Sequence, residues 1–123
     1  MDNRRVHRIS EEMRREVADL VQNKLKDPRI PEFTSISYVE VTRDLSFANI
    51  GISVLGNEEE KMDALEGINS AKGFIKKELG KRLKLRQMPE LIFHTDDRIE
   101  KSMEFQRFLE EVQAEDERRE LDR

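Results

Sequence analysis

Cysteine is absent from this chain of 123 residues, which excludes a disulfide scaffold and a thiolate metal site and fits a reducing compartment. The longest apolar runs span only a few residues, too few to cross a membrane. The N-terminal residues 1–5 lack the apolar stretch of a signal peptide. Aromatic residues are scarce, at 6%, which argues against a broad platform on which nucleic-acid bases stack. These absences predict a soluble, cytoplasmic protein.

Signatures of catalysis are also missing. The two histidines, His7 and His94, lie far apart in sequence, and the chain has no phosphate-binding P-loop and no serine with an evident activating partner. Asp96 and Asp97 could bind a cation, but capping of a following helix is the favoured use of an aspartate at such a place. We therefore predict no enzyme, no metal and no cofactor, with a metal-dependent nuclease as the weakest alternative.

Hydrophobic residues make up only 36% of the chain and charged residues 41%, a composition that by itself permits disorder. The apolar residues nevertheless recur at regular spacings, which indicates one folded domain with heavily solvated faces. Steps of three and four residues predict a long amphipathic helix over 3–26, which Pro28 ends. Alternation predicts two strands, over 34–42 and 47–55, joined as an antiparallel hairpin.

The second half of the chain predicts a broken helix, a strand and a further helix. Asn57 is a suitable N-cap, the helix after it should falter at residues 70–73, and Pro89 should stop the resumed helix. A short strand over 91–94 follows, and then a helix that Asp97 and Glu100 open with a capping box. The sequence thus predicts an α+β two-layer sandwich in the order α-β-β-α-α-β, with a three-stranded sheet and an extra C-terminal helix.

Three side-chain assignments follow from these periods. In the first strand, Ile36 and Tyr38 should point opposite to Val39 and Val41. The helix after Asn57 should bury a face of apolar residues, namely Met62, Leu65 and Ile68. Within the first helix, Glu11 should pair with Arg15.

The charge of the chain is unevenly distributed. The net charge is -4, yet residues 70–88 contain seven lysines and arginines and a single acidic residue. On a helical wheel the apolar residues of this region gather on one side, and the lysines sweep across the opposite arc together with Gly73 and Gly80. Backbone without side chains, flanked by ammonium groups, suits a sugar-phosphate chain. The alternative is an ordinary solvated helix face.

A second basic set lies on the first helix, where interleaved glutamates explain much of it through intrahelical pairs, and this ordinary interpretation is the favoured one. We keep three of its members, Arg4, Arg5 and Arg8, as auxiliary RNA contacts. Near the end of that helix, Lys24, Lys26 and Arg29 are expected to complement the C-terminal helix dipole.

The order of elements matches a type II KH domain, in which a Gly-x-x-Gly loop between two helices normally clamps nucleic acid. Here Ala71-Lys72-Gly73 stands at that place. With this interrupted loop, several motifs in order resemble ribosome-binding factor A of bacteria over residues 3–112, namely VEVTRDL at 39–45, ANIGISV at 48–54, GFIKKEL at 73–79 and PELIF at 89–93, followed by Asp96.

The resemblance implies a non-catalytic assembly factor that binds the immature small (30S) ribosomal subunit. It also implies help with late maturation and 5′-end processing of 16S rRNA, a contact with the 5′ region of that RNA, and a link to cold adaptation. By analogy, residues 71–73 form a helix-kink-helix and the following basic residues face RNA. The RNA-binding residues expected there are Ala71, Lys72, Gly73, Lys76, Lys77, Lys81, Lys84 and Arg86.

The last helix supports an alternative function. Its apolar residues could hold a protein partner, which would make the chain a protein-interaction module; the candidates are Ile99, Met103, Phe105 and Phe108. The chain divides on this interpretation into a KH-like RNA-binding domain at 1–97, a C-terminal helix at 98–113 and a charged, flexible tail at 114–123. We expect a monomer.

Overall fold

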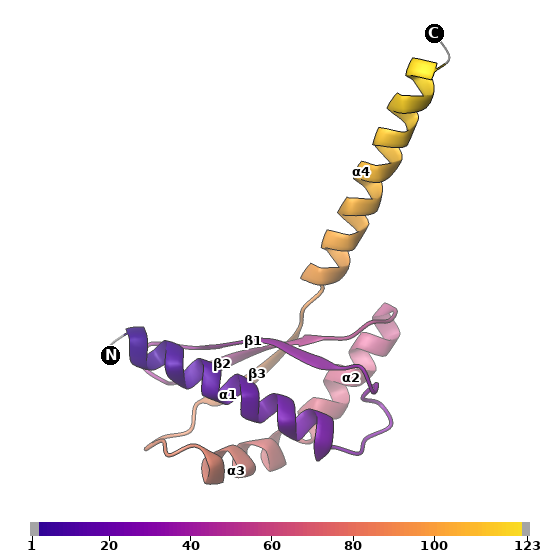
Figure 1. The fold of residues 1–123 in the computed structure, drawn as a ribbon. Helices are drawn as coiled ribbons and strands as arrows, with labels where there is room; N and C mark the ends of the chain where they lie inside the picture. Colours follow the sequence, from indigo (N-terminus) through magenta and orange to yellow (C-terminus); the bar gives the residue numbers. More distant parts are fainter. Residues whose placement is uncertain (1–2, 122–123) are drawn as a thin grey trace.

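The computed structural model describes residues 3–121, and in the last helix it leaves the side chains of residues 99–102, 116 and 119–121 undescribed. The elements follow the predicted order (Figure 1). Their bounds are α1 Asn3–Asn23, β1 Ser35–Val41, β2 Phe47–Ser53, α2 Glu58–Ser70, α3 Lys72–Arg82, β3 Glu90–Thr95 and α4 Arg98–Leu121. No helix among these described residues is long and apolar enough to span a membrane.

The sheet has three strands in the order β1-β2-β3. β1 and β2 form the expected antiparallel hairpin, whereas β3 runs parallel to β2, with Ala48 opposite Leu91. A parallel pair needs a long crossover, which α2 and α3 supply. Asn57 begins this crossover as predicted, because its side chain accepts from Glu60 N at 2.8 Å while the Glu60 carboxylate accepts from Asn57 N.

The core lies between the sheet and the layer formed by α1, α2 and α3, which lie on one side of the sheet in Figure 1. The predicted stripe of α1 is buried, as are the alternate residues of β2 and the inward face of α3. The fully or almost fully buried members include Met13, Val17, Leu20, Ala48, Ile50, Ile52, Ile75 and Leu79. The two-layer α+β architecture predicted from the sequence is confirmed.

The alternation predicted for β1 is wrong at its start. Ile36 is buried together with Val39 and Val41, rather than opposite to them. A register shift between Ile36 and Tyr38 explains the difference, because an extra residue in one strand changes which face the residues before it occupy. Tyr38 occupies the outer face over Gly51, where even a Cβ atom would collide with the Tyr38 ring.

Two further side-chain assignments need correction. Met62 is 65% exposed, and α2 instead buries a face rotated by about one residue, with Ala64 and Ile68 at its centre. On α1, Glu11 accepts from Arg14 at 3.2 Å rather than from Arg15. The helical period of α2 is right, but the elements that face it set which side is buried. On α1 the partner differs because i,i+3 and i,i+4 neighbours are both within reach on a helix surface.

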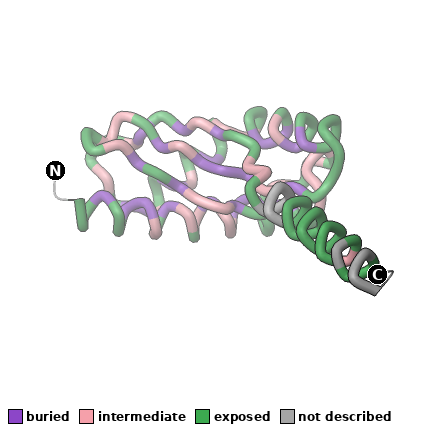
Figure 2. The backbone as a smooth tube through the Cα atoms, turned by 90° about the horizontal axis from the view of Figure 1, so that it is seen from above, coloured by how far each residue is buried: buried purple, intermediate pink, exposed green. Residues whose placement is uncertain are grey.

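The last helix leaves the body of the protein, as Figure 1 shows, and its described residues are almost all exposed (Figure 2). It extends to Leu121, so residues 114–121 are helical where the sequence predicts a flexible tail. Asp96 anchors its start, because its carboxylate accepts from Ser37 Oγ at 2.7 Å and from Arg98 Nη2 at 2.8 Å. The side chain of Glu100, predicted to complete a capping box, lies outside the described residues.

Candidate nucleic-acid interface

The break between α2 and α3 is a single residue, Ala71, which ends one helix and begins the next with φ -95° and ψ 5°. Its N–H donates to Ile68 O at 3.0 Å, and its carbonyl accepts from Ile75 N at 2.9 Å. A methyl group offers no acceptor, so no side chain caps α3. The partial positive charge of the α3 N-terminus therefore adds to that of the lysines around it.

Packing does not require either glycine of α3. A Cβ atom at Gly73 or Gly80 would meet no atom within 4 Å, and neither residue has a positive φ. Gly80 lies in the helix interior, where glycine costs about 1 kcal/mol relative to alanine. The fold does not require a glycine there, and the open backbone leaves room for close approach of another molecule.

The predicted RNA-binding residues of this region surround the two glycines, and the structure places most of them at the surface. Lys76, Lys77, Lys81, Lys84 and Arg86 are exposed, and Lys72 is half-buried. Lys76 lies 3.5 Å from a Glu90 carboxylate oxygen, and Lys81 lies 3.3 Å from one of Glu78. Such exposed pairs contribute only about 0–1 kcal/mol, so both lysines can exchange their carboxylate for a phosphate.

Arg82 has a different role from its basic neighbours. Its Nη1 donates to Glu16 Oε2 at 2.8 Å and to Asp19 Oδ2 at 2.7 Å, both on α1. These contacts raise the pKa of Arg82, and the hydrogen bond from Arg82 is the main reason why the pKa of Asp19 is lowered. Arg82 therefore fastens α3 to α1.

The fold brings the two predicted basic sets together. Arg5 and Arg8 of α1 line one groove with Lys84, which follows α3, and the groove has a volume of about 400 Å³. Sequence spacing could not show this proximity, since the two sets are separated by most of the chain. Arg4 is exposed on the first turn of α1 and does not line the groove.

A contact that the sequence did not predict holds the end of α2 next to the kink. Arg29 forms a fork with Asp27, donating from Nη2 to Oδ2 at 2.6 Å and from its backbone N to Oδ1 at 2.9 Å. The same guanidinium donates to Ser70 Oγ at 3.2 Å and lies 3.5 Å from Glu66 Oε1. Arg29 thus supports the kink, instead of complementing the helix dipole as predicted.

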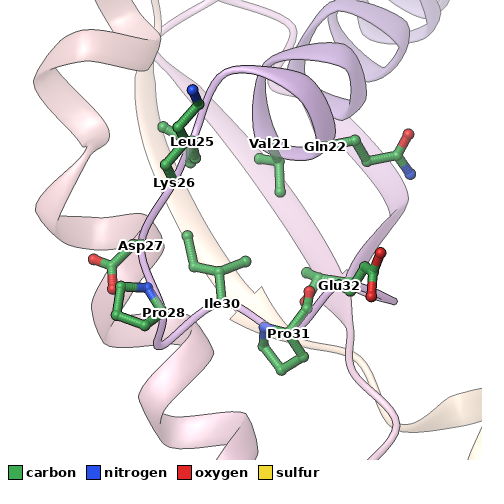
Figure 3. A pocket seen from close by; sticks show the side chains of 10 residues that line it. Val21, Gln22, Leu25, Lys26, Asp27, Pro28, Ile30, Pro31 and Glu32 are labelled. Carbon is green, nitrogen blue, oxygen red and sulfur yellow. The ribbon is translucent and has the colours of Figure 1, made fainter.

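The Asp27 carboxylate has a pKa lowered to about 2, chiefly because the Arg29 side chain donates to it. The loop also packs closely on α2, since a Cβ atom at Gly67 would lie 3.0 Å from Ile30 Cγ1. In Figure 3, Asp27 and Pro28 lie on the side of the loop that faces α2. The Asp-x-Arg spacing is a signal from which the turn could have been predicted. No local signal shows that Arg29 also contacts Ser70 and Glu66 on α2.

The pocket drawn in Figure 3 lies beside that loop and measures about 350 Å³. Val21, Leu25 and Ile30 supply its apolar wall. Asp27, which also lines the pocket, has a lowered pKa because the Arg29 side chain donates to it. Across the described residues, no three His, Cys, Asp or Glu side chains form a metal-binding group.

Tyr38, Phe47 and His94 lie on the sheet and differ in their surroundings. Arg98 lies over the Tyr38 ring, 5.0 Å from its centroid, so that ring is already covered on one side. Phe47 is 46% exposed and stays accessible to a ligand. His94 Nε2 lies 3.2 Å from Asn49 Oδ1 on the neighbouring strand, which fits a surface histidine held by a hydrogen bond.

Comparison with known proteins shows which family this chain resembles. Residues 5–109 match the family model described as ribosome-binding factor A. The chain is 47% identical over 110 residues to ribosome-binding factor A of Acetivibrio thermocellus, which covers 89% of each chain. It is 44% identical over 114 residues to the same factor of Staphylococcus saprophyticus, covering 93% of this chain and 99% of that one.

The fold is also similar to a solved structure of a relative. The solution structure of a Thermotoga maritima protein, described as a putative ribosome binding factor A, superposes with a TM-score of 0.67 at 30% identity, covering 76% of this chain and 89% of that one. Its likeness extends the agreement from sequence to architecture. The chain belongs to the ribosome-binding factor A family.

Proposed function

We propose that this chain is a non-catalytic assembly factor that binds the immature small ribosomal subunit through its basic surface. Its role would be to assist late maturation and 5′-end processing of 16S rRNA in the cytoplasm, also when cells grow in the cold. It would act as a monomer and without a cofactor. Family membership supports the ribosome as its target. A Thermus thermophilus homology model, fitted into a cryo-EM map of a 30S-RbfA complex, superposes on this chain with a TM-score of 0.59 at 25% identity.

The observation that carries the proposal is a basic surface whose composition the fold does not explain. We define this RNA-binding surface by Ala71, Lys72, Gly73, Lys76, Lys77, Lys81, Lys84 and Arg86, with Arg4, Arg5 and Arg8 as auxiliary members. It combines exposed cations, an uncapped helix N-terminus and two glycines without a packing role. Cations and open backbone recognise phosphates and not bases, so specificity would come from the shape of folded RNA.

Salt dependence tests this surface directly. We compare Lys77→Glu with Arg107→Glu, since both residues are exposed and both substitutions change the net charge equally, but Arg107 lies on α4. Loss of one phosphate contact should reduce the slope of log affinity against log salt by about 0.7–0.9 and weaken binding to purified immature subunits. Arg107→Glu should leave the slope unchanged. Equal slopes for both variants would refute a phosphate contact at Lys77.

The role in RNA processing needs a separate measurement. Cells that carry only the Lys77→Glu variant should accumulate 16S rRNA with an unprocessed 5′ end, whereas cells with Arg107→Glu should not. Primer extension on total RNA distinguishes the two ends. The purified protein should leave the precursor uncut with or without divalent metal, and cleavage would revive the nuclease alternative.

A further inference from the structure

The helix α4 carries an apolar stripe that nothing in the described part of the chain covers. Phe105, Phe108, Leu109 and Val112 are 62%, 58%, 43% and 40% exposed. They occur at positions i, i+3, i+4 and i+7, which places them within an arc of about 100°. In proteins most of the stability of a helix comes from packing such a face, so the stripe indicates a missing partner.

Acidic residues border this stripe. On one side lie Glu104, Glu111 and Glu115, all exposed. The other side begins with Gln106 and Gln113, and two further glutamates, Glu110 and Glu117, lie beyond them. Arg107, Arg118 and Met103 lie on the far side of the helix, about as far from the stripe as Glu110 and Glu117. The bordering charges therefore repel RNA phosphates and attract a cationic surface.

We propose that α4 binds a lysine- and arginine-rich protein that offers an apolar groove, of the kind that packs on ribosomal RNA. The spacing of the stripe is that of the anchors in helix-in-groove recognition, where an amphipathic helix lays its apolar face into a partner. A second copy of α4 would present another acidic border instead of a cationic surface, so it fits the stripe less well. The proposal rests on the proposed function, since the small subunit would bring this partner within reach.

The anchor at the start of α4 makes two simultaneous contacts possible. Asp96 is bonded to Ser37 of β1 and to Arg98, and Arg98 lies over Tyr38, so the first turn is tied to the sheet. From there the 24-residue helix extends about 36 Å away from the layer that contains α3. RNA at α3 and a protein at α4 would then be bound together, and each contact would raise the local concentration of the other.

This assignment also corrects the set of residues expected to contact a partner. Phe105 and Phe108 belong to the stripe, but Met103 lies on the opposite face and lines a shallow pocket with Leu55 and Gly56. The side chain of Ile99 lies outside the described residues. Met103 thus offers a matched control, because it is an exposed apolar residue of the same helix that the proposal leaves out.

The first test is affinity for immature subunits over a salt series. The double variant Phe105→Ala with Phe108→Ala should bind roughly 10- to 100-fold more weakly, because two anchors are lost. Its salt slope should stay that of the parent, since no phosphate contact is removed. Met103→Ala should bind within about twofold of the parent, as expected for a residue outside the contact. Unchanged affinity of the double variant would overturn the docking of α4, while the Lys77→Glu result judges the RNA contact independently.

The second test identifies the partner. Because the chain lacks cysteine, Gln113→Cys provides a single attachment point for a benzophenone maleimide at the border of the stripe. Illumination of the full chain on immature subunits should cross-link it to a protein rich in lysine and arginine, identified by mass spectrometry. A cross-link to ribosomal RNA, or to a second copy of the chain, would overturn the proposal, and so would the absence of any cross-link from a variant that still binds.

Discussion

The helices α1 and α4 carry similar sequence patterns and end in opposite environments. Both have apolar residues at helical spacing and charged residues elsewhere, and they are 21 and 24 residues long. The stripe of α1 forms the core, with Met13, Val17 and Leu20 fully buried, whereas the stripe of α4 faces outward. Periodicity therefore shows that a helix has a face to bury, but not whether the cover comes from the same chain.

The same hydrogen-bonded turn, with the sequence Asp-x-Arg, follows α1 and precedes α4. After α1, Asp27 accepts from the backbone N and the guanidinium of Arg29, and before α4, Asp96 does the same for Arg98. The first fork reaches across to Ser70 at the kink, and the second lies against Tyr38. The same Asp-x-Arg turn thus supports the kink beside the proposed RNA-binding surface in one place and the direction of α4 in the other.

The largest expected effect is a difference in the free energy of unfolding between substitutions in the α1 stripe and in the α4 stripe. Leu20→Ala in α1 should lower the free energy of unfolding by about 2–5 kcal/mol, because it leaves a cavity in the core. Leu109→Ala in α4 should change it by no more than about 0.5 kcal/mol, as for other surface substitutions. Urea denaturation followed by circular dichroism measures both. A large loss for Leu109→Ala would mean that α4 packs on the body of this chain.

The second-largest expected effect concerns Gly80 on the exposed side of α3, which can be compared with the exposed stripe of α4. Gly80→Ala should raise the free energy of unfolding by about 0.8–1 kcal/mol, since alanine is the better helix former and its methyl group meets no atom. The same variant should bind immature subunits more weakly if another molecule approaches the backbone there. Stabilisation without any loss of binding would show that Gly80 lies on an ordinary solvated face.

The smallest effect concerns pH and compares the two Asp-x-Arg turns. Because the folded-state pKa of Asp27 is lowered, its carboxylate stabilises the fold above its ordinary pKa of 3.8, and this stabilisation is lost as the pH falls towards about 2. Asp27→Asn should therefore differ most from the parent above pH 4 and converge with it in stronger acid. Asp96→Asn should behave likewise, since the pKa of Asp96 is also lowered. Urea titrations across pH 2–6 measure the free energy of unfolding of each variant and of the parent. A difference between variant and parent that stays constant over this pH range would contradict the prediction.

Much of the local structure could be predicted from the residues. The α1 stripe, the β hairpin, the Asn57 cap and the break at Ala71 all depend on signals within a few positions of each other. Apart from the length of α4, which continues to Leu121, the errors arose where the outcome depends on a neighbouring element. The bulge after Ile36 changed the inner face of β1, and the buried face of α2 left Met62 exposed, because the facing elements and not the helical period set the rotation.

The candidate site was predictable as a set of residues but not as a surface. The sequence identified the basic residues after the kink, yet it could not show that Arg82 is held by Glu16 and Asp19, which are more than 60 positions away. Nor could it show that Arg5 and Arg8 share a groove with Lys84. Both facts depend on how α1 packs against α3. The spacing of residues along the sequence carries no information about this packing.

By itself the sequence determined where helices and strands form and how charge divides between a basic middle and an acidic end, because propensity, capping and charge are properties of short segments. Only the tertiary structure decided which apolar stripe became core and which cations stayed available at the surface. The physical reason is that burial and ion pairing are relations between segments distant in the chain, so their partners exist only after the chain has folded.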